Sequence, residues 1–522
     1  MSESSSAPHA PDASSLSASH TADTTAPAAS HTIGPTVPAA PFARWPVGAV
    51  ALATLAVLLI ASPRYGYHRD ELYFRMLGER PALGYFDTPP LTPLIARASI
   101  AVFGDTVVAL RVVPALIASL VVVLVALLAR ELGGDRRAQI VAAAGIATTT
   151  LLLIGGHSLL TLGVDLPLWV AAALFAVRAL RGDGRWWLAL GAVAGVATYN
   201  RQLIVLLLVS VGVGVLAAGP REVLRDRRLW LGALLALVIA APNLVYQATH
   251  GWPQLVMAGA LEADEGADNR LAFVPLQLLL LGPPQAVVQV VGAVRLWREP
   301  RLRCLALAYP LACALTLYSG GRPDYVAGLL VLLFAAGCGP VSRWMSGAGR
   351  RALVVGALAV NAVLSVVIAL PVIPPSALEG TPVAGINEVA RESIGWPEFA
   401  ARVAGVVGGL TPQERARTVL LTDNYGEAGA LDRYGGDYGL PEVHSGHNEL
   451  YRRGPPSPSA RIAVVVTDSP GGYSRAFTTC EERGRIDNGV GLSNEEQHLP
   501  ILVCRDPLRP WQLLWPEMRH HS

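Results

Sequence analysis

The chain contains no lysine, and charged residues of either sign are scarce. All 41 residues in the Lys+Arg count are arginine, and charged residues make up 15% of the 522 positions, against about 25% in an average soluble protein. Hydrophobic residues reach 52%. This balance excludes an ordinary soluble globular protein. The formal net charge of +2 argues neither for nor against nucleic acid, and we expect no nucleic-acid partner.

Several familiar motifs are also missing. There is no Walker loop, no G-x-S-x-G elbow and no dinucleotide fingerprint between a strand and a helix. Five cysteines are present, without C-x-x-C or Cys/His metal spacing. The sequence therefore identifies no particular cofactor, and it leaves open whether a divalent metal binds. Cys304, Cys313 and Cys338 lie in or beside apolar runs and are predicted to be packing residues, whereas a disulfide between Cys480 and Cys504 is left open.

The N-terminal segment is polar and of low complexity. Residues 1–42 are rich in Ser, Ala, Thr and Pro, and Phe42 is the first aromatic residue. Such a tract buries too little apolar area to fold, so it is predicted to be a disordered tail. It has no basic stretch followed by a cleavage site, so we expect no secretory signal peptide. The apolar run at 46–62 is predicted to be an uncleaved signal anchor.

Apolar runs of near-spanning length continue to residue 371, against the roughly 20 residues that a transmembrane helix needs. Several are short or interrupted by Pro and Gly. They predict an all-α polytopic membrane bundle of about 11 transmembrane helices over residues 43–372. The runs lie at 46–62, 107–128, 138–155, 165–180, 187–199, 203–218, 229–247, 272–294, 304–319, 325–341 and 351–371.

Arginine lies in every second loop between these runs, as the positive-inside rule requires of cytoplasmic loops. We therefore expect a multi-pass protein of the cytoplasmic membrane. Its N-terminus is predicted to be cytoplasmic, whereas the loop after the first run and the tail after 371 are predicted to be extracytoplasmic. The basic loops contain Arg130, Arg136, Arg137, Arg178, Arg181, Arg185, Arg221, Arg225, Arg227, Arg228, Arg295, Arg298, Arg301, Arg303, Arg343, Arg350 and Arg351.

The two extracytoplasmic parts have patterns of their own. In the first outer loop, 63–106, residues 91–102 place apolar side chains at helical spacing and predict a juxtamembrane helix. The sequence GYFDTPP at 84–90 predicts a turn before it. Residues 375–522 alternate strands and short helices, which predicts a small α/β domain. We expect strands at 418–422, 461–467 and 499–504 and helices near 384–393, 396–407, 426–434 and 471–480.

Asp70 and Glu71 follow the first apolar run directly, within YHRDELY at 67–73. A charged side chain near hydrocarbon costs about 2.5–3.5 kcal/mol on insertion scales, so its presence suggests function. Neighbouring residues on a helix point about a hundred degrees apart, so only one of the two can face a given cleft well. One is predicted to be a general base for an acceptor hydroxyl. The alternative is a helix start at which acids are favoured by the dipole.

Three further charged residues are predicted to lie on the same outer face. Asp87 is in the turn before the juxtamembrane helix, and Asp165 is at the outer end of two apolar runs. A capping role competes for Asp165. Arg322, beside two glycines and ahead of Tyr325, is a candidate phosphate ligand. Interfacial snorkelling is its alternative.

Other residues are weaker candidates. Arg201 closes an apolar run on the outer side and is a second candidate for the phosphate, and His68 and Arg69 precede the acidic pair. His68 and His250 could equally be surface residues. His444 and His447 are spaced as two metal ligands would be, but no third ligand accompanies them.

These segments resemble glycosyltransferase family 39, a GT-C group that includes protein O-mannosyltransferases and the lipid A aminoarabinose transferase. The resemblance covers most of 46–341. It is carried by YGYHRDELYF at 65–74, GYFDTPPL at 84–91, RVVP at 111–114 and ARELGG at 129–134, with NYGEAGA at 424–430 and SGHN at 445–448.

The resemblance implies an inverting transfer of a sugar from a polyprenyl phosphate to an acceptor hydroxyl, with an Asp of the first outer loop as base. Asp70 matches that position, and Asp165 matches the second acidic position. Asp87 falls where some relatives place a carboxylate that meets the acceptor or a metal. Arg322 matches a Lys or Arg, although Pro323 and Asp324 interrupt the aromatic pair that follows it in relatives. Relatives carry Asn-Lys where this chain has Asn-Arg at 200–201.

The resemblance makes the expected partners a polyprenyl-phosphate-linked sugar, a protein, lipid or glycan acceptor, and membrane lipid. Two readings from other classes remain open. A secondary transporter would place ionisable residues near the midplane of inverted repeats, whereas these acids gather at outer ends and no repeat is visible. A non-catalytic membrane scaffold would use the α/β domain as a binding module.

Overall fold

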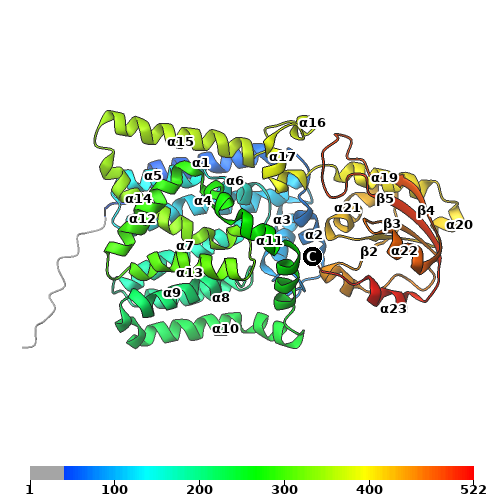
Figure 1. Ribbon diagram of the computed structural model, residues 1–522, viewed down its shortest axis with the longest axis horizontal. Helices are drawn as coiled ribbons and strands as arrows, with labels where there is room; N and C mark the ends of the chain where they lie inside the picture. Colours follow the sequence, from blue (N-terminus) through cyan, green and yellow to red (C-terminus); the bar gives the residue numbers. More distant parts are fainter. Residues whose placement is uncertain (1–39, 522) are drawn as a thin grey trace, which may run out of the picture. The chain divides into compact units, whose positions relative to one another are not determined.

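Apolar helices make up most of the chain up to residue 369 in the computed structural model, which describes residues 40–521 (Figure 1). The described residues all belong to one unit, Ala39–Ser522. The disordered tail predicted for residues 1–42 lies almost entirely outside the described residues.

Within residues 40–521, six helices are long and apolar enough to cross a membrane, or up to eight spans if each of two bent helix pairs counts as one. The six are α1 (Arg44–Ala61), α4 (Val107–Glu131), α7 (Thr161–Leu180), α10 (Arg227–Thr249), α14 (Ala327–Trp344) with the preceding turn η2 (Pro323–Val326), and α15 (Ala348–Ala369). The bent pairs are α5 (Arg136–Ala147) with α6 (Thr150–His157), and α11 (Pro253–Leu281) with α12 (Pro283–Arg298). Shorter apolar helices are α3 (Leu91–Phe103), α8 (Trp186–Ala197), α9 (Ile204–Ala218) and α13 (Arg303–Tyr318).

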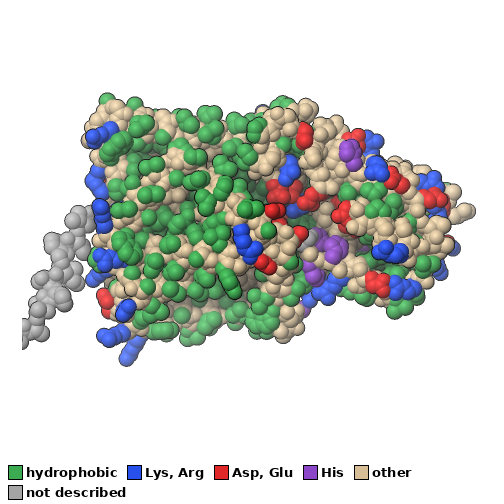
Figure 2. Space-filling view, viewed as in Figure 1, with side chains coloured by type: hydrophobic (Ala, Val, Ile, Leu, Met, Phe, Trp, Pro, Cys, Tyr) green, Lys and Arg blue, Asp and Glu red, His purple; other side chains and the backbone are tan. Residues whose placement is uncertain are grey.

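The predicted all-α bundle is confirmed, and its apolar runs fall on these helices. The predicted count of about 11 transmembrane helices is not confirmed, because six helices, or up to eight spans, among residues 40–521 are long and apolar enough to cross a membrane. Two runs are not straight helices. The run at 138–155 bends by 59°, and the run at 272–294 bends by 94°. At the second bend Gly282 has φ +95 and is followed by Pro283 and Pro284, which lack the N–H that a continuous helix needs. Apolar side chains cover the surface of the helical part (Figure 2), as expected of helices that face lipid.

The C-terminal residues form a five-stranded sheet in the order β2-β1-β3-β5-β4. The strands are β1 (Thr418–Thr422), β2 (Val443–Ser445), β3 (Ile462–Val466), β4 (Phe477–Arg485) and β5 (Pro500–Pro507). β1 runs parallel to both β2 and β3, whereas β5 is antiparallel to β3 and β4. β1 and β3 are buried along their whole length, which fits their unbroken apolar sequences. The predicted small C-terminal α/β domain is confirmed.

Three of the five strands match the predicted strands, and two were missed. β2 is only three residues long, and the predicted helix at 471–480 is divided between α22 (Pro470–Ala476) and β4. β4 is an edge strand with most of its residues exposed, so it lacks the apolar alternation that marks a half-buried strand. The pairing left open from the sequence is formed, because Cys480 and Cys504 face each other on β4 and β5 and are joined by a disulfide.

Two helices form the contact between the membrane bundle and the sheet. α2 (Arg69–Glu79) follows α1, and α21 (Tyr425–Tyr434) follows β1. Their backbones approach closely: a Cβ at Gly429 would lie 2.7 Å from the Cβ of Leu72, and one at Gly426 would lie 2.8 Å from the Cβ of Arg69. Glycine is needed at both positions, and one buried apolar cluster therefore runs from α2 into the sheet.

Candidate functional site

α2 begins at the start of the predicted acidic motif and holds it in a fixed position. His68 is the N-cap, and its ring accepts a hydrogen bond from the backbone N–H of Asp70 at 3.1 Å. Glu71 completes a capping box by accepting the N–H of His68 at 2.9 Å. The two acids then have different surroundings, as their neighbouring positions on one helix predict.

Asp70 and Asp87 are linked through two stacked tyrosines. The Tyr425 hydroxyl donates to Asp70 Oδ1 at 2.9 Å, and the Tyr73 hydroxyl donates to Asp87 Oδ1 at 2.8 Å. The two tyrosine rings stack with centroids 4.6 Å apart. Asp70 remains only partly buried. Each of the two carboxylates is therefore hydrogen-bonded to one ring of the same stacked pair.

Asp87 is in the less polar environment of the two. Burial raises the pKa of Asp87 to about 7; the Tyr73 hydrogen bond opposes this shift, and the negative charges of Glu449 and Asp70 add to it. Glu449 itself accepts the backbone N–H of Phe86 at 2.7 Å. A carboxyl whose pKa is displaced this far by its surroundings is a candidate functional group.

Glu71 is enclosed, and its carboxylate is occupied. It forms a buried ion pair with Arg111 of α4 at 2.8 Å, and both side chains have 0% exposure. The backbone N–H of Leu159 also donates to it at 2.9 Å. Arg111 in turn donates to the carbonyls of Ser62 and Gly66. These contacts hold α1, α2, α4 and the 158–160 segment together, and they leave Glu71 no surface for a substrate.

His68 and Arg69 face an acidic cluster from the C-terminal part. Arg69 pairs with Glu392 at 3.1 Å and Glu495 at 2.8 Å, and His68 pairs with Glu392 at 2.8 Å. Burial lowers the pKa of His68, but the hydrogen bond to Glu392 and the charge of Asp70 give a net rise. Figure 2 shows acidic and histidine side chains gathered between the apolar bundle and the C-terminal part.

The same cluster contains a candidate metal site. Glu388, Glu392 and Glu495 offer carboxylate oxygens within 4.8 Å of one another, and this is the one such group among residues 40–521. Carboxylate oxygens suit hard cations such as Mg²⁺ or Mn²⁺. Here, however, His68, Arg69 and Arg322 already neutralise these glutamates. The cluster is therefore a poor fit for a resident metal.

Asp165 lies near the start of α7 in a second part of the candidate site. It is 6% exposed, and Oδ1 is buried without a hydrogen-bond partner in the described structure. Asn200, Arg201 and Asp324 are its polar neighbours. Arg201 pairs with Asp324 at 3.1 Å and lies over the Tyr325 ring at 5.4 Å. An unsatisfied buried oxygen beside a guanidinium is typical of a ligand site.

Arg322 lies beside this second part but has acidic partners of its own. It pairs with Glu388 at 3.4 Å and Glu265 at 3.7 Å. Arg201 therefore has the more enclosed position, with 21% side-chain exposure against 43% for Arg322.

The two parts of the site are joined by the turn that contains Asp87. Thr92 Oγ1 donates to Asn200 Oδ1 at 2.7 Å, and the N–H of Leu91 donates to the carbonyl of Tyr199 at 2.8 Å. The start of α3 thus fixes the Asn200–Arg201 segment close behind the turn. None of the hydrogen bonds or ion pairs found between the described residues connects Asp70 to Asp165 directly.

Several residues of the site were not predicted from the sequence as functional. Tyr425, Glu392, Glu449 and Glu495 come from the C-terminal part, more than 300 residues away from the acidic motif. The NYGEAGA segment did carry a signal, but nothing in the sequence pairs it with Asp70. The weak histidine candidates divide. His250 is exposed and stacks on Tyr246, and His444 contacts Glu442 at 3.8 Å. His447 lies beside the site, because its ring accepts the backbone N–H of Tyr425 at 3.1 Å and stacks on the Tyr425 ring.

Comparisons with known sequences point to one group of proteins. A family model described as dolichyl-phosphate-mannose-protein mannosyltransferase matches residues 87–246. The chain is 27% identical over 347 residues to the undecaprenyl phosphate-alpha-4-amino-4-deoxy-L-arabinose arabinosyl transferase 1 of Pseudomonas fluorescens. This match covers 61% of each chain, so it spans less than two thirds of that relative's length.

Comparisons with solved structures extend the likeness to most of the chain. The structure of ArnT from Cupriavidus metallidurans bound to undecaprenyl phosphate aligns with a TM-score of 0.55 at 17% identity, covering 87% of this chain and 97% of that one. The apo structure aligns with a TM-score of 0.52 at 16% identity. At these identities the alignment establishes the fold alone. The resemblance drawn from the sequence is confirmed.

Proposed function

On the premise that this chain is a member of the GT-C glycosyltransferases, we propose that it transfers a sugar from a polyprenyl-phosphate donor to an acceptor hydroxyl. The transfer takes place at the outer face of the cytoplasmic membrane, with the N-terminus inside and residues 375–522 outside. An outward-facing site has no cytoplasmic nucleotide sugar within reach, so a lipid carrier is the donor that suits it. The solved relative of the same fold is described as bound to undecaprenyl phosphate, which supports this donor class.

Asp70 is the proposed general base. It takes the proton of the acceptor hydroxyl while that oxygen attacks the anomeric carbon from the face opposite the phosphate, so the configuration is inverted. The Tyr425 hydrogen bond at 2.9 Å fixes the carboxylate and stabilises its charge. This contact is the observation that carries the proposal, because it orients one accessible acid at the contact between bundle and sheet.

Arg201 is the proposed phosphate ligand. As the glycosidic bond breaks, negative charge accumulates on the leaving phosphate, and a fixed guanidinium stabilises it. In the described structure its charge is balanced by Asp324 at 3.1 Å, a pairing that the phosphate would replace or share. Arg322, Tyr325 and Arg69 are proposed to line the donor path, and the unsatisfied Oδ1 of Asp165 is proposed to accept a substrate hydroxyl.

Asp87 and Glu71 have different proposed roles. Asp87, held by Tyr73, is proposed to contact the acceptor close to Asp70. Glu71 is proposed to act as a positioning residue, because its pairing with Arg111 fixes the start of α2 and hence Asp70. His68 acts in the same way through its cap on the Asp70 N–H. No step of the proposed reaction runs through a metal.

The proposal is tested with membranes from cells that express the chain and from matched cells with an empty vector. Both are incubated with labelled polyprenyl-phosphate hexoses, pentoses and amino sugars. We expect at least one donor to be consumed, with label transferred to envelope material only when the chain is present. If no donor is consumed and solute uptake depends on the chain, the result would contradict the glycosyltransferase proposal and favour a transporter.

A further inference from the structure

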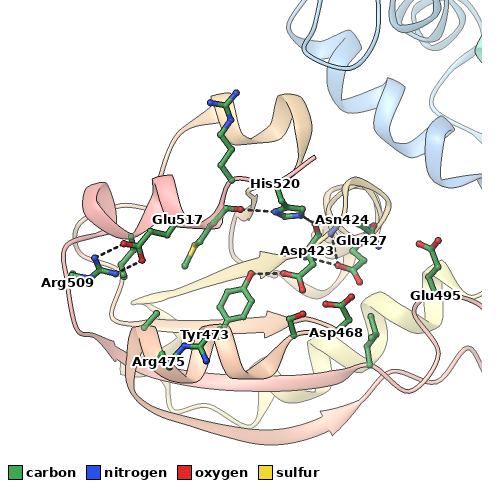
Figure 3. Close-up of a pocket in the computed structure, with 17 residues that line it drawn as sticks. Asp423, Asn424, Glu427, Asp468, Tyr473, Arg475, Glu495, Arg509, Glu517 and His520 are labelled. Atoms are coloured by element: carbon green, nitrogen blue, oxygen red, sulfur yellow. Dashed lines mark hydrogen bonds and ion pairs between the residues drawn. The ribbon is translucent and has the colours of Figure 1, made fainter. Parts of the chain in front are cut away.

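The C-terminal part contains a large cavity that the proposed reaction does not use. Its volume is about 860 Å³, within the roughly 300–1,000 Å³ range of small-molecule sites. It opens where β1 and β3 end, and Figure 3 shows the polar side chains that point into it. Asp423, Asn424, Glu427, Asp468, Gly472 and Tyr473 are among its lining residues.

The sheet topology favours a ligand at this place. β1 and β3 are parallel neighbours, and Asp423 and Asp468 follow their carboxyl ends. The chain leaves β1 through α21 to β2 on one side of the sheet, and leaves β3 through α22 to β4 and β5 on the other. In open α/β sheets, ligands bind outside the carboxyl ends of strands where the connections diverge in this way.

The chemistry of the lining is that of a hydroxyl-binding site. Tyr473 donates to Asp423 Oδ1 at 2.7 Å, and Asp468 lies at the same end of the sheet. Carboxylates and amides accept hydrogen bonds from several hydroxyls at once, and Tyr473 adds an aromatic surface. These groups are arranged around an open cavity of definite volume, rather than on a flat surface.

Anions are disfavoured in this cavity. Acidic residues outnumber arginines among the lining side chains, and Arg509 is already paired with Glu517 at 2.5 Å. The N-terminus of α21 does not offer free N–H groups, because Asn424 and Glu427 form a capping box there. Arg475 and Arg519 also line the cavity, but five acidic residues against three arginines leave an excess of negative charge that disfavours phosphate.

A bound cation is also disfavoured. The one cluster of three mutually close acidic, His or Cys ligands within residues 40–521 shares only Glu495 with this cavity. The remaining ligand class that fits a large, polar, net acidic cavity is a neutral or amino-bearing carbohydrate.

The cavity adjoins the proposed reaction centre. Asn424 lines it, and the next residue, Tyr425, hydrogen-bonds Asp70. Glu495 also lines it and pairs with Arg69 at 2.8 Å. The cavity wall is therefore one residue along the chain from the side chain that holds Asp70.

We propose that this cavity is the acceptor subsite and that the acceptor is a hydroxyl-rich carbohydrate rather than a protein or a lipid. The inference rests on the proposed function for the identity of the ligand as acceptor, but binding itself can be measured without any donor. The saccharide lies over the ends of β1 and β3, and its terminal hydroxyl reaches Asp70.

Gly472→Phe is the sharpest test of the cavity. Gly472 lines the cavity and a Cβ there meets nothing within 4 Å, so an aromatic side chain can be placed at the cavity wall without a clash at its Cβ. Gly436→Phe is the matched control, because Gly436 is also exposed with nothing within 4 Å and does not line the cavity. Tyr473→Phe is a milder second variant that removes only the hydroxyl bonded to Asp423.

Binding is measured on the purified full chain by saturation-transfer NMR. The probes are hexose and pentose methyl glycosides, their disaccharides and glucosamine, with inorganic phosphate and Ca²⁺ as separate arms. We expect a saccharide signal in the wild type and Gly436→Phe, with a loss of at least tenfold in Gly472→Phe and a smaller loss in Tyr473→Phe. No saccharide signal, an unchanged signal in Gly472→Phe, or displacement by phosphate or Ca²⁺ would overturn the subsite.

A second readout separates this inference from the proposed function. Glycosyl transfer to envelope acceptor and slow hydrolysis of the donor by water are followed in parallel. We expect Gly472→Phe to lower transfer at least tenfold while hydrolysis stays within twofold of the wild type. If Gly472→Phe transfers sugar at the wild-type rate, the acceptor subsite is contradicted but the proposed function is not. If the wild type binds saccharide but consumes no donor, the proposed function is contradicted but saccharide binding in the cavity is not.

Discussion

The hydroxyl of Tyr425 donates a hydrogen bond to Asp70 Oδ1 at 2.9 Å, between residues 355 positions apart in the sequence. One residue opens α21 of the C-terminal part and the other lies in the first turn of α2. The C-terminal part therefore supplies a side chain to the candidate site at this end of the bundle. Both parts therefore contribute to the surroundings of Asp70.

Tyr425→Phe is expected to lower transfer about ten- to a hundredfold, because hydrogen bonds to charged groups contribute about 1.5–3 kcal/mol. The ring and its stacking on Tyr73 at 4.6 Å are retained, so the fold stays intact. The turnover rate of the purified variant is the measurement, with Tyr438→Phe as the control because Tyr438 is 51% exposed. Equal turnover rates for Tyr425→Phe and Tyr438→Phe would show that the Tyr425 hydroxyl has no role in the reaction.

Glu71→Gln is expected to destabilise the protein rather than to act on the chemistry selectively. It leaves Arg111 charged and buried without its partner, which costs about 3–5 kcal/mol. The thermal unfolding midpoint in detergent is expected to fall sharply, whereas the exposed control Glu442→Gln leaves it unchanged. An unchanged midpoint in Glu71→Gln would contradict the stabilising role of the Glu71–Arg111 pair.

Asp87 is expected to make stability depend on pH. Its pKa in the folded protein is about 7, against an ordinary value of 3.8, so the folded state binds the proton more tightly than the unfolded state. Its contribution to stability is fully present below about pH 4, decreases as the pH rises to about 7, and is then constant. The slope is at most about 1.4 kcal/mol per pH unit.

Asp87→Asn removes this titration. Unfolding midpoints of wild type and variant are compared from pH 4 to pH 8, and the difference between them is expected to shift in favour of the variant as the pH rises. A difference that is independent of pH would show that Asp87 is ionised in the folded protein throughout this interval.

The Cys480–Cys504 disulfide is expected to stabilise the edge of the sheet. It joins β4 to β5, and a cross-link of this kind contributes about 2–4 kcal/mol. Reduction with dithiothreitol is expected to lower the unfolding midpoint of the wild type and to leave the Cys480→Ser/Cys504→Ser variant unchanged. If dithiothreitol lowered the unfolding midpoint of that variant by the same amount, the loss of stability would not come from the disulfide.

Much of the fold could be predicted from the sequence because the local signals were strong. Apolar runs identified the bundle, and unbroken apolar segments identified β1, β3 and β5. The failures have local reasons. β4 carries charged residues on both faces of an exposed edge, and the Gly282-Pro283-Pro284 sequence breaks a run that remains apolar on both sides.

The candidate site was predicted only in part because its contacts are long-range. Asp70, Asp87 and His68 lie in short motifs with chemical meaning of their own. Which acid of the Asp70–Glu71 pair is enclosed depends on Arg111, which belongs to a different helix. The pairing of Tyr425 with Asp70 depends on close packing of α2 on α21 through Gly426 and Gly429, a feature that periodicity does not reveal.

The most direct measurement is transfer of labelled sugar from a polyprenyl-phosphate donor by membranes that contain Asp70→Asn. Asp437→Asn, an exposed change in the C-terminal part, is the matched control, and both variants are adjusted to equal protein level. We expect Asp70→Asn to lower transfer by about 10²–10⁴-fold, the contribution of a general base, while the control keeps the wild-type rate. Wild-type transfer by Asp70→Asn would contradict the assignment of Asp70 as the base.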